Sequence, residues 1–249
     1  MVLERGGAMA TEVGALNYSP DFESKSCRRI IQNIPNNHDE WLEKEGGIEN
    51  PTHGKTIAEE CQQKRIKWLC ENVVGNRILE LGCNWGYILD AVCKYSKASF
   101  GLGIDINLTN INKALRNFPD RYFIVRDITD PFRMQVFKDN SFNTVMLPDV
   151  LEHLTKGGVK FVVSEALRIA LDKVLITLPL EENKKHCFKH KWMVNEEDVY
   201  KIADVMRPEC WAVSISNDSD FYYIIGDLRK FHYTTKEANE KVQIVSNGR

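Results

Sequence analysis

The sequence predicts an α/β protein: a three-layer sandwich on a seven-stranded sheet that is mostly parallel, with an antiparallel last strand. From residue 56 onward, short apolar runs alternate with segments of helical periodicity, which is typical of parallel strands joined by helices. The last two runs, 211–216 and 221–226, are separated by a short polar turn and predict a hairpin. A chain of 249 residues with 43% hydrophobic residues can bury the core of one such domain.

A glycine turn connects the first predicted strand, 77–81, to a helix over 87–95. The strand is apolar apart from Glu80, and the turn 82–86 has the sequence GCNWG. Glycine allows close approach of the backbone to a ligand, and the free N–H groups of the helix start face that ligand. Asn84 stands between the glycines, and asparagine is the next best residue at positive φ. A dinucleotide site and a plain structural turn are the alternatives.

Acidic residues end two further strands at the same edge of the predicted sheet. Asp105 ends the strand 98–106, and a carboxylate there accepts two hydrogen bonds from a ribose diol. Asp127 follows the strand 121–125 and is itself followed by Ile128. For both acids a strand-end cap or a turn residue is the alternative interpretation.

The fourth strand, 141–147, runs into the segment 148–154, which reads PDVLEHL. Together with the glycine loop, Asp105 and Asp127, this segment resembles the class I S-adenosylmethionine-dependent methyltransferases of the small-molecule type, such as those of ubiquinone biosynthesis and sugar modification. The resemblance covers roughly residues 56–228. It implies a Rossmann-like sheet whose last strand inserts beside the sixth. A dehydrogenase would need residues for a nicotinamide, and the chain has none beyond the glycine loop.

The resemblance implies S-adenosyl-L-methionine as the cofactor. Glu80 would act through the backbone and the amino group of the methionine moiety, and Asp105 would hold the ribose. Asp127 and Ile128 would hold the adenine. The cofactor-binding residues expected from the resemblance are Glu80, Gly82, Cys83, Asn84, Gly86, Asp105, Ile106, Asp127, Ile128, Pro148 and Asp149.

The resemblance also suggests three parts of the chain. Residues 1–55 form an N-terminal arm and helical lid, with residues 39–60 contributing to the lid. Residues 56–228 form the S-adenosylmethionine-binding domain, and 229–249 form a polar tail.

We expect methyl transfer to an oxygen or nitrogen of a small-molecule acceptor. The methyl group already carries a cationic leaving group, so positioning the acceptor in line does most of the catalysis. A base is needed only where the acceptor must lose a proton. His153 and His190 are the expected bases, with His186 as a further candidate, because imidazole accepts protons near neutral pH. The alternative for His153 is a structural role that shapes the pocket.

A metal-binding site formed by the same residues is an alternative interpretation. Asp149, Glu152 and His153, with His190 or His186, resemble the small-RNA 3′-end 2′-O-methyltransferases, in which carboxylates and histidines hold a divalent metal over the terminal ribose hydroxyls. That family has a Glu-x-x-Glu-His segment, whereas the first acid here is Asp149. We therefore expect no metal. A catalytically silent S-adenosylmethionine-binding module is the non-enzyme alternative.

The composition indicates which partners and which cellular compartment to expect. A net charge of -2 and a pI of about 6.3 argue against nucleic acid, although Lys184, Lys185, Lys189 and Lys191 could form a basic rim for an anionic acceptor. The seven scattered cysteines lack a C-x-x-C pair, which favours free thiols in the cytoplasm. No stretch approaches the roughly 20 apolar residues of a membrane span, and the N-terminus lacks a secretory signal.

Overall fold

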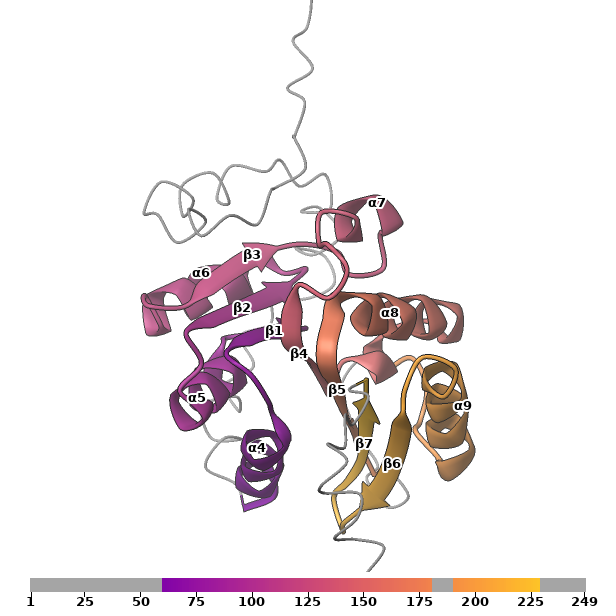
Figure 1. Ribbon diagram of the computed structural model, residues 1–249. Coiled ribbons are helices and arrows are strands. Elements are labelled where there is room, and N and C mark those ends of the chain that lie inside the picture. Colours follow the sequence, from indigo (N-terminus) through magenta and orange to yellow (C-terminus); the bar gives the residue numbers. More distant parts are fainter. Residues whose placement is uncertain (1–59, 181–189, 229–249) are drawn as a thin grey trace, which may run out of the picture.

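One seven-stranded sheet forms the centre of the computed structural model, which describes residues 60–180 and 190–228 (Figure 1). The strands are β1 (Arg77–Leu81), β2 (Phe100–Asp105), β3 (Tyr122–Val125), β4 (Phe142–Pro148), β5 (Ala170–Pro179), β6 (Ala212–Asn217) and β7 (Phe221–Asp227). Their order is β3-β2-β1-β4-β5-β7-β6. Strands β1 to β5 pair in parallel, and β7 lies antiparallel between β5 and β6. The predicted Rossmann-like sheet, with its inserted last strand, is confirmed.

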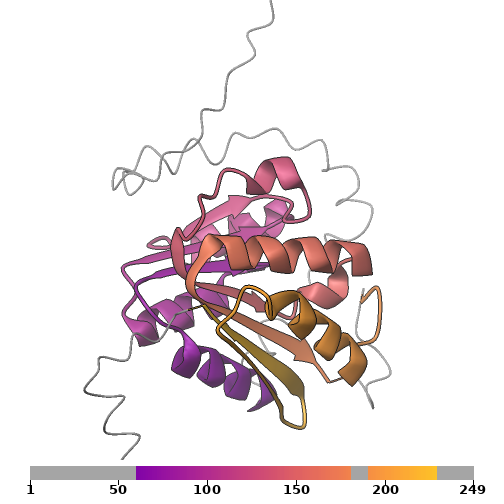
Figure 2. The same cartoon turned by 45° about the vertical axis from the view of Figure 1, so that its right-hand side comes forward.

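Helices cover both faces of this sheet (Figures 1 and 2). They are α4 (Glu60–Asn72), α5 (Tyr87–Ser96), α6 (Leu108–Asn117), α7 (Pro131–Met134), the 3-10 turn η3 (Leu151–His153), α8 (Lys156–Ile169) and α9 (Glu196–Met206). Helices α4, α5 and α6 lie on one face, and α8 and α9 lie on the other. This arrangement gives the three layers that the alternation of strands and helices predicts.

Alternation along the strands divides the core between the two faces. Ile78 belongs to the apolar cluster of α4, α5 and α6, which includes Leu69. The next residue, Leu79, belongs to the cluster of α8 and α9, which includes Val162. Strands buried on both faces require continuous apolar runs, and the predicted strands have them.

Local signals place most element boundaries, with two differences. Asn107 and Asn195 cap α6 and α9 with their side chains, as expected of asparagine. The short helix α7 was not predicted, although Asp130 caps it and Pro131 begins it. The apolar run 173–178 predicts the fifth strand, whereas β5 starts at Ala170, because α8 leads directly into it and Ala170 pairs with Phe142.

Several predictions fall outside the described residues. These are the N-terminal arm and nearly all of the lid segment 39–60, the acceptor-side loop over 181–189, and the tail 229–249. None of the helices that the structure describes has the length and hydropathy required to cross a lipid bilayer.

Candidate active site

The candidate site lies at the carboxyl ends of the central strands. Strand β1 lies between β2 and β4, so the chain order reverses at the β1–β4 boundary. In open α/β sheets, ligands bind outside the strand ends at such a reversal. The loops that leave these strands are 82–87, 105–107 and 148–154, and the loop after β3 follows at 127–129.

The glycine loop takes a conformation that depends on positive φ angles. Gly82 and Gly86 both have φ 80°, and Asn84 has φ 48°. A Cβ atom at position 82 would lie 2.5 Å from a methyl carbon of Val150, so the loop after β1 touches the loop after β4 where only glycine fits. The positive φ at Asn84 explains why asparagine can replace a glycine there.

Asp105 joins the glycine loop to the end of β2. Its Oδ2 accepts a 2.9 Å hydrogen bond from the N–H of Asn84, and its Oδ1 accepts a 2.8 Å bond from the N–H of Asn107. Burial raises the pKa of this carboxyl, while these two bonds act in the opposite direction. The backbone of the same loop is also held by Ile104, whose carbonyl accepts hydrogen bonds from the N–H groups of Gly82 and Cys83.

Glu80 is a buried acid beneath the glycine loop. It is 1% exposed, and burial raises the pKa of its carboxyl to about 8. Arg65 and a backbone hydrogen bond from Leu89 lower this pKa in part. Among the described residues Oε2 has no hydrogen-bond partner. A carboxyl in this state can gain a favourable interaction from a cationic ligand.

The remaining predicted cofactor residues lie at the same edge with more local contacts. Asp127 Oδ1 accepts hydrogen bonds from the N–H and the hydroxyl of Thr129, at 2.8 and 2.7 Å. Ile128 is 7% exposed and packs into the core, and Ile106 is half-buried. Pro148 is buried at the end of β4. Asp105 is therefore linked to the glycine loop, whereas these contacts tie Asp127 to its own loop.

Asp149 turns the chain out of β4 with φ 49°, and an unpredicted partner holds it. Its N–H donates to the carbonyl of Thr177, and its Oδ1 accepts a 2.8 Å bond from the Thr177 hydroxyl. Its Oδ2 forms an ion pair with Arg65 of α4, 84 residues earlier in the sequence. No local pattern marks Arg65, so sequence reasoning missed it.

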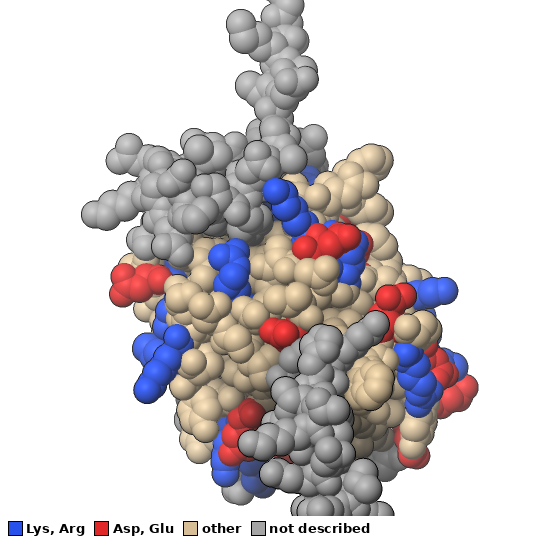
Figure 3. Space-filling model, viewed as in Figure 1, with Lys and Arg blue, Asp and Glu red and all other residues tan. Residues whose placement is uncertain are grey.

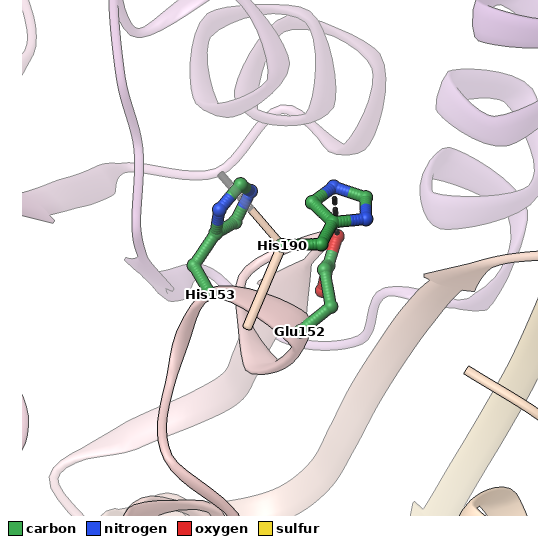
Figure 4. Close-up of side chains that lie close together, drawn as sticks. All are labelled: Glu152, His153 and His190. Carbon is green, nitrogen blue, oxygen red and sulfur yellow. Dashed lines mark ion pairs between the residues drawn. The ribbon is translucent and has the colours of Figure 1, made fainter. Parts of the chain in front are cut away.

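A carboxylate and two imidazoles meet just beyond Asp149 (Figure 4). Glu152, His153 and His190 each offer a ligand atom, and these atoms lie within 4.8 Å of one another. Oε1 of Glu152 is 3.9 Å from Nε2 of His190, and the two imidazole centroids are 4.7 Å apart. The Glu152 carboxylate is buried, whereas His153 is exposed. The structure therefore brings the two predicted bases together; His186 lies outside the described residues.

Two hydrogen bonds attach the chain after His190 to η3. The N–H of Lys191 donates to the carbonyl of Glu152, and the indole N–H of Trp192 donates to the carbonyl of Leu154, both at 2.9 Å. These bonds fix His190 beside Glu152. The resulting group suits two kinds of chemistry: proton acceptance by an imidazole next to a carboxylate, or coordination of a divalent cation by two nitrogens and an oxygen.

Charge on the surface gives no sign of a nucleic-acid patch on the face in Figure 3. There, lysine and arginine side chains are interspersed with acidic ones over the described part of the surface. A backbone-binding surface for nucleic acid would gather its basic residues on one face or along one groove.

Comparison with known proteins supports a methyltransferase. Residues 78–171 match the family described as a methyltransferase domain. An O-methyltransferase family protein from Burkholderia thailandensis has a similar structure, with 15% identity and a TM-score of 0.58, over 73% of this chain and 60% of that one. A SAM-dependent methyltransferase from Archaeoglobus fulgidus has 18% identity and a TM-score of 0.54, over 68% of this chain and 93% of that one. The methyltransferase domain of bacterial CtHen1-C has 14% identity and a TM-score of 0.55, over 68% of this chain and 98% of that one. No curated protein matches the sequence.

Residues 78–171 therefore form a methyltransferase domain. The sheet order and the loop geometry are those of the class I S-adenosylmethionine-dependent methyltransferases, whose cofactor is S-adenosyl-L-methionine.

Proposed function

We propose that this methyltransferase acts on an oxygen or nitrogen of a small-molecule acceptor, with an imidazole as the base. The observation that carries the proposal is the group of Glu152, His153 and His190 at the carboxyl end of β4. It follows directly on Asp149 and Val150, and Val150 touches the glycine loop. This sequence of contacts supports a base close to the loop proposed to hold the cofactor.

The cofactor roles proposed for individual residues have support from their geometry. The unpartnered oxygen of buried Glu80 suits the ammonium group of the methionine moiety. Asp105 accepts hydrogen bonds from the N–H groups of Asn84 and Asn107 and from the side chain of Asn110, and the two oxygens of a carboxylate have about four lone-pair sites, which supports a further bond from a ribose hydroxyl. Asp127 and Ile128, at the end of β3, are proposed to contact the adenine.

The carboxylate beside His190 supports its role as a base. Oε1 of Glu152 lies 3.9 Å from Nε2 of His190, so the carboxylate can orient the imidazole toward an acceptor. His153 stacks edge-on against this ring and is exposed, so it can reach an acceptor from the solvent side. The chain's own residues then orient the acceptor and take its proton, and S-adenosylmethionine supplies the methyl group.

The test is formation of S-adenosylhomocysteine with a panel of phenols, sugar hydroxyls, amines and carboxylic acids. With an acceptor that must lose a proton, His190→Asn and His153→Asn should lower kcat by about 100-fold or more where the ring is the base. Lys160→Ala, an exposed change on α8, is the control. If no acceptor in any class gives product while the cofactor binds, the silent binding module is the better description.

A second candidate is metal-assisted methylation of an RNA 3′ end. The specific observation in its favour is that two imidazoles and a carboxylate converge as a divalent metal requires. The fold is shared with the methyltransferase domain of CtHen1-C. Glu152, His153 and His190 would hold the cation, which would polarise a ribose hydroxyl when bound. Asp149 does not fit the ligand set of that layout, since Arg65 and Thr177 take up its two oxygens.

Metal and RNA are tested separately from the small-molecule panel. Added Mn²⁺ or Mg²⁺ with a short single-stranded RNA should give 3′-terminal methylation that a chelator abolishes, if the second candidate is correct. Turnover of a small acceptor that a chelator leaves unchanged would favour the first.

We also propose that residues 56–228 form the catalytic domain, with 1–55 as its arm and lid and 229–249 as a tail. Four cysteines of the described part, Cys70, Cys83, Cys93 and Cys210, are free thiols, which is consistent with a cytoplasmic protein.

A further inference from the structure

The strained residue at the end of β4 depends on one side chain from outside the sheet. Asp149 is not glycine but has φ 49°, a conformation that a non-glycine residue keeps only where its surroundings hold it. Two of its three fixed contacts come from Thr177 on the neighbouring strand β5. The third is the ion pair with Arg65, which belongs to α4.

Arg65 is itself held in a defined place. Its side chain is 10% exposed, and its guanidinium lies over the ring of Phe221, 5.1 Å from the centroid. Phe221 begins β7 and pairs in register with Pro179, at the end of β5. The ion pair is therefore largely shielded from water. Loss of one partner would leave the other as a buried, unpaired charge, which is energetically costly.

We infer that Arg65 is a positioning residue: through Asp149 it sets the position of Glu152 and His153 relative to the glycine loop. Only Val150 separates Asp149 from η3, which begins at Leu151. Val150 packs against Gly82 of the glycine loop. A change in the backbone at Asp149 must therefore move either the contact with Gly82 or the three-residue turn that carries Glu152 and His153. The consequence for turnover rests on the proposed function, whereas the consequence for the imidazoles does not.

Variants of Arg65 and Asp149 can distinguish a residue that positions Glu152 and His153 from one that only attaches α4 to the sheet. Arg65→Met removes the charge and keeps most of the apolar stem, and Arg65→Lys restores a charge without the planar guanidinium. Asp149→Asn keeps an oxygen for Thr177 and tolerates positive φ, but weakens the pair with Arg65. It also leaves the Arg65 charge near Glu80, whose pKa that charge lowers. Arg168→Met is the matched control, because Arg168 also pairs with acids but binds Phe137 and Asp139 before the start of β4.

The first readout needs no acceptor. In the full chain, the imidazole Cε1–H resonances of His153 and His190, assigned with single histidine variants, are recorded by NMR at one pH for each variant. We expect Arg65→Met and Asp149→Asn to move the His153 resonance, Arg65→Lys to bring it back toward the wild-type position, and Arg168→Met to leave it in place while lowering the melting midpoint.

The second readout is turnover with the acceptor found in the panel. A misplacement of about 1 Å can cost about 100-fold, so kcat should fall by about that factor in Asp149→Asn, with a smaller loss of affinity for S-adenosylhomocysteine. An unmoved His153 resonance in Arg65→Met and Asp149→Asn would overturn the inference and leave Arg65 as a docking contact. If Arg65→Met does not fold, Asp149→Asn decides. If the resonance moves but no acceptor is methylated, the proposed function fails and the positioning role stands.

Discussion

The N–H of Asn84 and the carboxylate of Asp105 are 2.9 Å apart, so one acid at the end of β2 holds the middle of the loop that follows β1. The second oxygen of the same carboxylate is held by Asn107 at the start of α6. Asp105 thus fixes the glycine loop and is also the residue proposed to hold the ribose. A change at Asp105 is therefore expected to act on the cofactor twice.

Removal of the Asp105 carboxylate should abolish cofactor binding. S-adenosylmethionine and S-adenosylhomocysteine at about 100 times their dissociation constants should stabilise the wild type by about 2.7 kcal/mol, and NAD should have no effect. Thermal shift with Asp105→Ala should show little or none of this gain, whereas Asp120→Ala, an exposed turn residue, should keep it. A full shift in Asp105→Ala would remove this acid from the cofactor site.

Asn84 should tolerate glycine but not a β-branched residue. At φ 48° glycine is unstrained, whereas valine is strongly disfavoured. We expect Asn84→Gly to bind S-adenosylhomocysteine nearly as the wild type does, and Asn84→Val to bind it at least about tenfold more weakly, since strain of this kind costs about 1–3 kcal/mol. Isothermal titration calorimetry measures both. Equal affinity in the two variants would mean that the loop changes conformation when the cofactor binds.

Glu80 should make the protein less stable as the pH rises. Its carboxyl titrates near pH 4.3 in an unfolded chain, but burial raises its pKa to about 8 in the folded protein. Between these values the folded protein keeps a proton that the unfolded chain has lost, so the free energy of unfolding falls with increasing pH.

Glu80→Gln cannot ionise and should remove that part of the pH dependence. Urea unfolding across this pH range measures the effect, with Glu71→Gln on the exposed side of α4 as the control. If the wild type and Glu80→Gln lose stability in parallel, Glu80 is not the group that titrates.

Two glycines should respond in opposite directions to the same substitution. A Cβ at Gly103 would lie 2.7 Å from Phe123 and 2.8 Å from Cys83, so Gly103→Ala should destabilise the core by about 1–3 kcal/mol. At Gly157, in the first turn of α8, a Cβ would meet no atom within 4 Å, and alanine favours helix by up to about 1 kcal/mol. Chemical denaturation should show a lower midpoint for the first variant and an equal or higher one for the second.

Local patterns predicted most of the fold because their signals lie within a few residues of one another. Strand β1 runs from Arg77 to Leu81 as predicted, and α9 is capped by Asn195, a residue type that favours this position. The start of β5 could not be placed in this way, because Ala170 joins the strand through its pairing with Phe142 of β4 rather than through an apolar run.

The candidate site was predicted less completely, for a physical reason. His153 and His190 were recognised as chemical groups, and their meeting depends on Trp192 and Lys191, whose hydrogen bonds no spacing rule describes. The pair of Arg65 and Asp149 joins a helix to a strand end across 84 residues. Contacts of that length follow from the three-dimensional arrangement, so sequence reasoning named Asp149 and missed what holds it.

The close approach of Val150 to Gly82 limits how this enzyme can change its substrate. Evolution or design that seeks a new acceptor must alter the surface beyond β4, yet a bulkier side chain at position 150 would press on Gly82, which has no side chain that could yield. New specificity is therefore best sought at positions farther along the chain than Val150, away from its contact with the glycine loop.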